Sequence, residues 1–527
     1  MTRWYKNLYF ILFLILLLGA FLRFFALGEN SFVADEFLDM NATYGYFQTG
    51  EWQAWDFNRG EIAQRENIAS DNRAWMYRIQ VATLFNFLSP TEAVARSISA
   101  LWGIITILLL YIVTSLFTRN RIIGLLAAFL FAVSISGIEF NRTLRMYAMF
   151  FPIFLLFSWT AFQAFEKPYT GKHSFLARIW KKLSINLFYT IPTVLLGLVS
   201  FHLHTLTGNI VLIILTYLLV MAISVWRKEK NLAKKYAYYF VALVLLIVFG
   251  ILFFGKGLQP FTQELIFFDN HWSYVVKILR DYAHPLLATL LLIAGSAYLL
   301  QQKNPPRDTF REGMWITVSF FTILFASIFL WRRNIGPQYI FFAQSFAIIL
   351  IASGIYAIAD FLRRHLRHSS EIGNSEDLLS WLGITQKHIF TIVIILGVLL
   401  VPNYGYFFEE NTTYHQTSRS DNPNYREVFT YFKKHRKTDD VLVTRNFRNY
   451  YFAGEKVSIF DFGGERTKKM ISLVELQNIM STNSSGWIIY ADNDEVFISK
   501  EARIFIEENL EKINDIAVRG NIRVYRW

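Results

Sequence analysis

The chain has 527 residues, of which 54% are hydrophobic and 17% aromatic, and its mean hydropathy is +0.31. A soluble fold of this length would not bury so much apolar surface, so the composition predicts a polytopic membrane protein. The net charge of +12 comes mostly from Lys and Arg in short stretches between apolar runs, which set topology, so no nucleic-acid partner is expected. The absence of cysteine excludes disulfides, thiol nucleophiles and thiolate metal sites.

The first apolar run covers residues 8–27 and is long enough to cross a bilayer core of roughly 30 Å. Leu22-Arg23-Phe24 near its end offers no small-residue cleavage site, so we interpret it as a retained span and not as a signal peptide. Asp35 and Glu36 follow shortly after this span and therefore face the far side of the membrane, near the headgroup level. An Asp-Glu pair in isolation is more often a solvated loop feature, so its meaning depends on the rest of the chain.

Further apolar runs lie near residues 97–117, 122–138, 146–165, 187–203, 208–226, 237–254, 284–300, 313–331, 338–360 and 388–404. Together with the first run they predict about eleven spans. The loops predicted to lie inside are rich in Lys and Arg, as in residues 172–182 and 227–235, whereas the short outer connections carry few cations. This bias predicts a cytoplasmic-membrane protein with its N-terminus inside and its C-terminus outside.

Two outer segments are larger than the other connections. Residues 28–92 and 255–283 mix apolar and polar side chains and predict helices that lie along the membrane surface. From about Tyr404 the composition changes to short β-rich runs such as DDVLVT and GWIIYA, between stretches with helical spacing. We therefore predict a transmembrane domain over residues 1–404 and a small extracytoplasmic α/β domain over residues 405–527.

The unusual polar residues of the membrane part all map to outer loops or outer ends of spans. They are Asp35, Glu36, Arg73, Arg142, Arg145, His202, His204, Arg332 and Arg333. A single arginine of this kind is usually an interface anchor, but cations from several separate segments beside carboxylates suit a phosphate, which Arg binds in a bidentate manner. His202 and His204 are two residues apart at a helix end and would not share a face for a metal, so hydrogen bonding to a sugar or phosphate, or capping, is favoured.

Several strings, taken in order, resemble the GT-C superfamily of lipid-dependent glycosyltransferases, in the branch of the protein O-mannosyltransferases and the aminoarabinose transferases of lipid A. ADEFLDMNATYGYFQTGEW resembles the Asp-Glu loop and the helix that follows it, TEAVARSISALWGIITILLLY resembles the second span, and GLLAAFLFAVSISGIEFNRTLRMYAMFF resembles the third span, the Arg-bearing turn and the start of the fourth. The Trp-Trp-Asp signature of oligosaccharyltransferase relatives is absent, which argues against transfer of a whole oligosaccharide to asparagine.

The resemblance implies roles for particular residues. It gives the catalytic carboxylate to Asp35, with Glu36 orienting Asp35, the acceptor or an ion. It implies donor and lipid-phosphate contacts by Arg73, Arg142, Arg145, Tyr147, His204, Arg332 and Arg333. Arg73 stands where family members often carry Lys or His before two prolines, and Arg332 or Arg333 substitutes for the arginine of an Arg-Tyr pair that here reads Gln338-Tyr339.

The expected function is transfer of a single sugar from a polyprenyl-phosphate or dolichyl-phosphate carrier to an acceptor hydroxyl on the outer face, by inverting displacement. The acceptor is a lipid, a polysaccharide or a protein. The sequence identifies no definite cofactor; a divalent cation is possible, but one acidic pair is a thin metal site. A transporter or flippase of lipid-linked sugars is the alternative, and it should carry charges at mid-span depth. A scaffold whose outer domain binds a partner would leave Asp35 and Glu36 unexplained.

Overall fold

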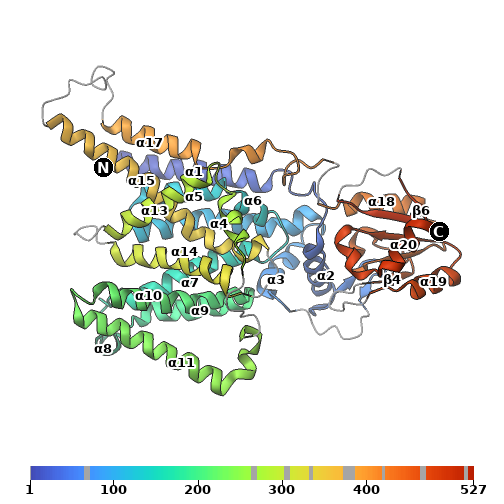
Figure 1. Cartoon of the computed structure of the whole chain (residues 1–527), viewed down its shortest axis with the longest axis horizontal. Coiled ribbons are helices and arrows are strands. Elements are labelled where there is room, and N and C mark those ends of the chain that lie inside the picture. Colours follow the sequence, from blue (N-terminus) through green and yellow to red (C-terminus); the bar gives the residue numbers. More distant parts are fainter. Residues whose placement is uncertain are drawn as a thin grey trace. The chain divides into compact units, whose positions relative to one another are not determined.

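The structure is a computed structural model of the chain, and it describes residues 2–63, 72–262, 270–301, 309–331, 336–371, 386–417, 422–462, 470–514 and 520–527. It is mostly helical, with a small β-sheet near the C-terminus, as the sequence predicts (Figure 1). The chain divides into two compact units. Unit 1 comprises Met1–Arg23, Ala100–Asn141 and Tyr147–Gly405, and unit 2 comprises Phe24–Ser99, Arg142–Met146 and Tyr406–Trp527. The predicted domain boundary near residue 404 stays a prediction.

Unit 1 is built from helices, and each predicted apolar run falls on one or more of them. They are α1 (Thr2–Phe24), the larger part of α4 (Glu92–Thr118), α5 (Arg121–Ala132), α6 (Ile135–Asn141), α7 (Tyr147–Glu166), α8 (Ser174–Leu183), α9 (Leu187–Leu203), α10 (Asn209–Val225), α11 (Lys230–Thr262), α12 (Ser273–Leu279), α13 (Pro285–Gln301), α14 (Phe310–Phe329), α15 (Gln344–Glu371) and α17 (Gln386–Leu400). Short 3-10 turns, among them η1 (Thr205–Gly208), η2 (Pro337–Tyr339) and η3 (Phe341–Ala343), connect some of these helices.

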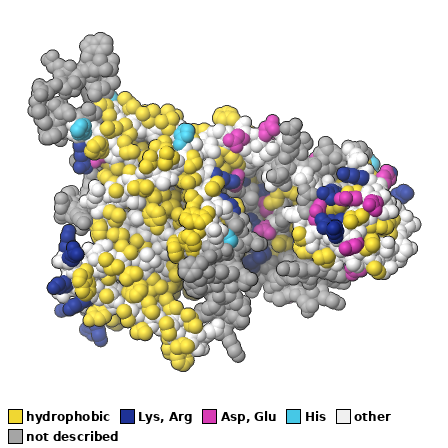
Figure 2. All heavy atoms as spheres, viewed as in Figure 1, with side chains coloured by type: hydrophobic (Ala, Val, Ile, Leu, Met, Phe, Trp, Pro, Cys, Tyr) yellow, Lys and Arg dark blue, Asp and Glu magenta, His cyan; other side chains and the backbone are white. Residues whose placement is uncertain are grey.

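The helices of unit 1 have the length and composition of membrane spans. In the described part of the chain seven are long and apolar enough to cross a bilayer, or up to nine if each of two bent pairs counts as one span. Two shorter apolar helices, Pro285–Gln301 and His388–Leu400, accompany them. Figure 2 shows hydrophobic side chains over most of the visible surface of this unit, with Lys and Arg gathered at its left margin. The chain is a multi-pass membrane protein, while the count of about eleven spans and the orientation stay predictions.

Two glycines permit the close crossing of α13 and α15. A Cβ atom at Gly295 would lie 1.8 Å from the carbonyl oxygen of Leu350, and one at Gly354 would lie 2.0 Å from that of Leu291. Contacts that short are impossible, so any larger residue would force the helices apart. Small residues at such crossings are typical of helices that pack within a membrane, where dispersion contacts replace the hydrophobic driving force.

The C-terminal part of unit 2 is an α/β layer built on a five-stranded sheet in the order β4-β3-β5-β7-β6. The strands are β3 (Val441–Thr444), β4 (Ile459–Asp461), β5 (Gly486–Tyr490), β6 (Glu511–Lys512) and β7 (Arg523–Arg526), and the helices are α18 (Tyr425–His435), α19 (Leu473–Thr482) and α20 (Lys500–Asn509). β3 and β5 pair in parallel and are buried along their whole length, as parallel strands covered on both faces require. The four predicted β-rich runs correspond to β3, β4, β5 and β7, whereas α19 and β6 were not predicted.

The N-terminal part of unit 2 packs directly on this C-terminal part. Its elements are α2 (Ala34–Thr49), the hairpin strands β1 (Trp55–Asp56) and β2 (Glu61–Ile62), and α3 (Trp75–Leu84). Phe37 of α2 is fully buried, with its ring centroid 5.6 Å from that of Tyr425 and 5.6 Å from that of Tyr451. Asn41, one turn further along α2, donates to the carbonyl oxygen of Phe447 at 2.9 Å. The C-terminal segment thus supplies part of the core that fixes α2. Helices are present within residues 28–92 as predicted, and the outer side and the position along a membrane surface stay predictions.

Candidate active site

The site is built on the first two turns of α2, whose ends are fixed locally. Val33 before the helix is extended (φ −109°), and its amide donates to the Glu36 carboxylate at 3.1 Å, so the third helical residue caps the helix start. At the other end Gly50 adopts a left-handed conformation (φ 76°), and its amide donates to the carbonyl oxygen of Tyr46 at 2.7 Å. These boundaries place Asp35 and Glu36 in the first turn, where the helix dipole favours negative charge.

Glu36 is a buried structural carboxylate. Arg96 of α4 binds it in a bidentate manner, with Nε 2.8 Å from Oε1 and Nη2 2.7 Å from Oε2, and the amide of Leu144 donates to Oε1 at 2.7 Å. The remaining donors of Arg96 point to the carbonyl oxygens of Leu27, Asn30 and Ser31 at 2.8–3.2 Å. Every N–H of this guanidinium therefore has an acceptor, which is what a buried charge needs to be stable. Glu36 ties α2 to α4 and does not bond to the side chain of Asp35.

Asp39 is also buried, and two arginines neutralise it. Arg78 of α3 approaches Oδ1 with Nε at 2.7 Å and Nη2 at 2.5 Å, while Nη1 of Arg145 lies 2.8 Å from Oδ2. Burial alone would raise the pKa of Asp39, but the positive charges of Arg78 and Arg145, and more weakly that of Arg73, hold the pKa below its ordinary value of 3.8. Asp39 is therefore an ionised anchor for two cations.

Asp35 differs from the other two carboxylates because it is open to solvent. Its side chain is 60% exposed, against 1% for Glu36 and 3% for Asp39. Its Oδ2 lies 3.2 Å from Nη2 of Arg145, whose Nη1 also contacts the Asp35 backbone carbonyl oxygen at 3.3 Å. Asp35 is thus an accessible carboxylate held by a nearly buried arginine, and its exposed oxygens are open to a ligand.

Helix geometry explains why the three acids behave differently. Asp35 and Asp39 are four residues apart and lie on one face of α2, so a single guanidinium can reach both of them. Glu36 is rotated by about 100° from Asp35 and faces α4 instead. The sequence predicts the acidic pair as a site, whereas roles for Asp39 and Arg78 and the pairing of Arg96 with Glu36 were not predicted. The spacing of Asp35 and Asp39 is the signal that could have indicated their common face.

The cations of unit 2 that were predicted to hold phosphate occupy different environments. Arg73 is exposed in the turn before α3, close enough to Asp39 to influence its ionisation. Arg142 is buried and donates to the backbone carbonyl oxygens of Phe25 and Ala26, at 2.5 and 3.1 Å. Its guanidinium also stacks 4.6 Å over the ring centroid of Tyr414. Arg73 and Arg145 therefore lie around Asp39, whereas Arg142 clamps the chain after the first helix.

The remaining predicted donor-binding residues belong to unit 1. Tyr147 and His204 are buried with ring centroids 5.4 Å apart, and the centroid of Tyr339 lies 6.2 Å from that of His204. His204 caps η1, because its Nδ1 accepts from the amide of Leu206 at 3.0 Å, which is one of the roles considered from the sequence. Arg332 and Arg333 lie outside the described residues.

The acidic pair does not fit a divalent cation. Glu36 would have to release Arg96 and the Leu144 amide to become a ligand, which leaves Asp35 as the single accessible carboxylate of the pair. In the part of the chain that the structure describes, no group of three His, Cys, Asp or Glu residues is placed to hold a metal ion. The site therefore presents one accessible carboxylate, that of Asp35, beside Arg145.

A second network connects the C-terminal segment to the loop that precedes α2 and to the start of α4. The Tyr451 hydroxyl accepts from the amide of Phe32 at 2.6 Å and donates to Glu92 at 2.9 Å. Arg426 binds Glu92 as well, with Nη2 at 2.5 Å, and donates to the carbonyl oxygen of Gly28 at 2.8 Å. Burial raises the pKa of Tyr451 far above its ordinary value, and the Glu92 charge adds to this, so the hydroxyl stays protonated. Sequence reasoning did not find these residues because their partners lie hundreds of positions apart.

Comparison of the sequence with models of known protein families gave no match, and comparison with curated protein sequences gave none either. Comparison of structures did find similar folds. The Archaeoglobus fulgidus oligosaccharyltransferase AglB, solved with an inhibitory peptide and a dolichol-phosphate, matches with a TM-score of 0.55 and 10% identity over 97% of this chain and 73% of that chain. ArnT from Cupriavidus metallidurans, bound to undecaprenyl phosphate, matches with a TM-score of 0.51 and 10% identity over 100% of this chain and 98% of that chain. The chain therefore has a fold similar to those of AglB and ArnT, which confirms the predicted resemblance at the level of the fold.

Proposed function

We propose that the chain is a glycosyltransferase that moves one sugar from a polyprenyl-phosphate carrier to an acceptor hydroxyl at the outer face of the cytoplasmic membrane. The observation that carries the proposal is the exposed carboxylate of Asp35, held by Arg145 in a fold otherwise known from enzymes that bind dolichol-phosphate or undecaprenyl phosphate. The coverage of nearly the whole of ArnT supports a transferase of one sugar over the alternative of oligosaccharide transfer. The absence of the Trp-Trp-Asp signature supports the same choice.

In the proposed reaction the acceptor oxygen forms a bond to the anomeric carbon while Asp35 takes its proton. The bond between that carbon and the phosphate oxygen breaks, and the electron pair leaves with the polyprenyl phosphate, so the anomeric configuration inverts. Negative charge grows on the leaving phosphate, and the exposed Arg73 is the cation of unit 2 best suited to receive it. The donor-binding roles of Arg142, Tyr147, His204, Arg332 and Arg333 rest on the sequence resemblance alone.

In this proposal Glu36 and Asp39 position Asp35 and do not themselves contact the reacting atoms. Arg145 is fixed by the buried Asp39 and in turn orients the Asp35 carboxylate. Glu36 fixes the helix start by binding Arg96, so the backbone beneath Asp35 cannot shift. Preorganisation of this kind lowers the cost of reaching the productive geometry.

The test is a transfer assay with the purified full chain in liposomes that contain labelled polyprenyl-phosphate sugars and soluble acceptor hydroxyl compounds. We expect formation of an acceptor glycoside and release of the unglycosylated lipid phosphate in equal amounts. Movement of the intact labelled lipid between leaflets with no glycoside formed, for every sugar offered, would favour the flippase alternative.

A further inference from the structure

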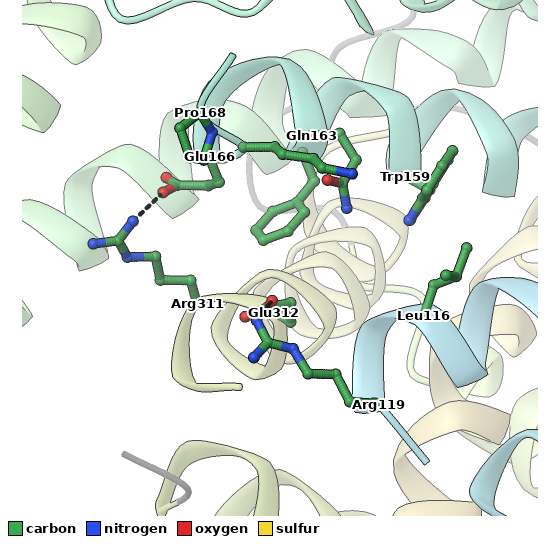
Figure 3. A pocket seen from close by; sticks show the side chains of 10 residues that line it. Leu116, Arg119, Trp159, Gln163, Glu166, Pro168, Arg311 and Glu312 are labelled. Atoms are coloured by element: carbon green, nitrogen blue, oxygen red, sulfur yellow. Dashed lines mark hydrogen bonds and ion pairs between the residues drawn. The ribbon is translucent and has the colours of Figure 1, made fainter. Parts of the chain in front are cut away.

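Unit 1 contains a charged cavity of about 460 Å³ that the proposed reaction does not use. It lies where one end of each of three helices meets, and Figure 3 shows the side chains that line it. They come from the end of α4 (Leu116, Arg119), the last turns of α7 and the residues after it (Trp159, Phe162, Gln163, Glu166, Lys167, Pro168), and the start of α14 (Arg311, Glu312). All three helices are candidate membrane spans, so the cavity lies at the level where a span leaves the bilayer.

Hydrogen-bond donors outnumber free acceptors in this cavity. Glu166 is saturated, because it accepts from the hydroxyls of Tyr217 and Tyr236 at 2.9–3.1 Å and from Nη1 of Arg311 at 3.1 Å. Arg119 donates to Glu312 at 3.1 Å. Each guanidinium carries five N–H groups, and the side chains of Arg119 and Arg311 are 49% and 42% exposed, so most of these donors remain available to a ligand.

Two further polar groups face the same space without a partner. The indole nitrogen of Trp159 is buried and has no hydrogen-bond acceptor among the described residues. The side-chain amide of Gln163, one turn further along α7, makes no hydrogen bond in that part of the chain either. In Figure 3 both side chains project from α7 toward the space that Arg119 and Glu312 border. A buried indole N–H without an acceptor is costly, which indicates that a ligand oxygen completes the site.

We propose that this cavity binds the phosphate headgroup of an anionic phospholipid. Arg119, Arg311 and the Trp159 N–H contact the phosphate oxygens, and the apolar wall of Leu116, Trp159 and Phe162 receives the first carbons of the chains. Cationic cavities between spans are suited to such headgroups, because the charge attracts the phosphate while the helices accept the tails. A free phosphate ion could form the same polar contacts as the headgroup, but it has no carbon chain to contact the apolar wall.

The test uses the delipidated full chain in detergent. Phosphatidylglycerol, phosphatidylcholine or inorganic phosphate is titrated while the thermal unfolding midpoint is followed and bound lipids are counted by native mass spectrometry. We expect phosphatidylglycerol to raise the midpoint and to remain bound. The double variant Arg119→Gln/Arg311→Gln should bind it about tenfold more weakly or worse, and Trp159→Phe, which keeps a ring but removes the donor, about three- to tenfold more weakly.

Arg364→Gln is the matched control. Arg364 is an exposed arginine of unit 1 that pairs with Asp360 at 2.5 Å outside the cavity, so its loss should leave lipid binding unchanged. If the double variant does not fold, Trp159→Phe decides the outcome. Wild-type binding by the cavity variants, or equal protection by phosphatidylcholine, would overturn the proposal. Equal protection by inorganic phosphate would replace the lipid with a soluble anion.

Discussion

The guanidinium of Arg145 lies 3.2 Å from the exposed carboxylate of Asp35 while its other amino group is fixed 2.8 Å from the buried Asp39. The side chain of Arg145 is 90% shielded from solvent, so its position depends on the buried pair and not on the exposed one. The exposed carboxylate of Asp35 is thereby oriented, through Arg145, by the buried charge of Asp39. Removing the buried charge should accordingly disturb the exposed one.

We expect Asp39→Asn to destabilise unit 2, because it removes the buried negative charge that both Arg78 and Arg145 bind. Breaking a buried ion pair from one side typically costs about 3–5 kcal/mol. The pKa of Asp39 is lowered on folding, so its contribution is present above the ordinary pKa of 3.8 and is lost as the pH falls below that value. Thermal unfolding between pH 3 and 7 should therefore show a smaller loss of stability at the acid end for Asp39→Asn than for the wild type. An identical pH profile for both proteins would contradict the buried-anchor role.

A separate prediction is that the effects on stability of substitutions at Glu36 and Arg96 are coupled. Arg96→Met should be more harmful than Glu36→Gln, because it removes the countercharge of a buried carboxylate and the guanidinium donors to three backbone carbonyl oxygens. The double variant Glu36→Gln/Arg96→Met should lose less stability than the sum of the single variants, by about 1–3 kcal/mol. Unfolding midpoints of the four proteins complete the cycle. Strict additivity would mean that the two side chains do not depend on one another.

The sequence was sufficient to predict the helical membrane part, the small sheet domain and the acidic pair, because apolar length, β-rich alternation and an isolated Asp-Glu dipeptide are local signals. The partners of the acids could not be predicted in the same way. Arg96 and Arg145 are 60 and 106 positions from the carboxylates they bind. The choice between an exposed Asp35 and a buried Glu36 depends on which face of α2 meets α4, and this is a property of packing. Arg142 and Arg145 were both predicted to contact the lipid phosphate, although Arg142 binds backbone carbonyl oxygens and Arg145 binds carboxylates.

The C-terminal segment is expected to influence activity through Tyr451. Tyr451→Phe removes the acceptor for the Phe32 amide and a donor to Glu92, which should cost about 1–3 kcal/mol and loosen the loop before Asp35. Turnover should fall while donor affinity changes little, since Tyr451 lies on the core side of the loop. Tyr431→Phe on α18, where the ring stacks on His435, is the control and should leave turnover unchanged. Equal turnover in both variants would remove the positioning role.

Arg73 and Arg142 were predicted to share a role, and substitution should separate them. Arg73→Gln should weaken binding of the lipid-phosphate donor by about 1.5–3 kcal/mol with little change in the unfolding midpoint, because the side chain is exposed. Arg142→Gln should instead lower the midpoint, since the buried Arg142 donates to the backbone carbonyl oxygens of Phe25 and Ala26. Donor affinity measured by displacement of a labelled lipid phosphate distinguishes the two effects. Weaker donor binding by an Arg142→Gln protein with an unchanged unfolding midpoint would support the role predicted from the sequence, a contact between Arg142 and the lipid phosphate.

The proposed mechanism depends most directly on Asp35. Asn has nearly the size of Asp and can still accept a hydrogen bond from Arg145, but it cannot take a proton from the acceptor. General base catalysis typically contributes about a hundred- to ten-thousand-fold in rate. Asp35→Asn should therefore insert, fold and bind the lipid carrier close to wild type while its turnover falls by about that factor.

One silent control and one comparison with a positioning variant make the Asp35 experiment decisive. Asp439→Asn changes another exposed aspartate of unit 2 and should leave turnover unchanged, which accounts for any general effect of losing a surface charge. Asp39→Asn cannot serve as a silent control, because Asp39 holds Arg145, so its turnover should fall together with its unfolding midpoint. A loss of turnover in Asp35→Asn at an unchanged midpoint would be the signature of a missing base. Wild-type transfer by a folded Asp35→Asn protein would show that another group accepts the proton.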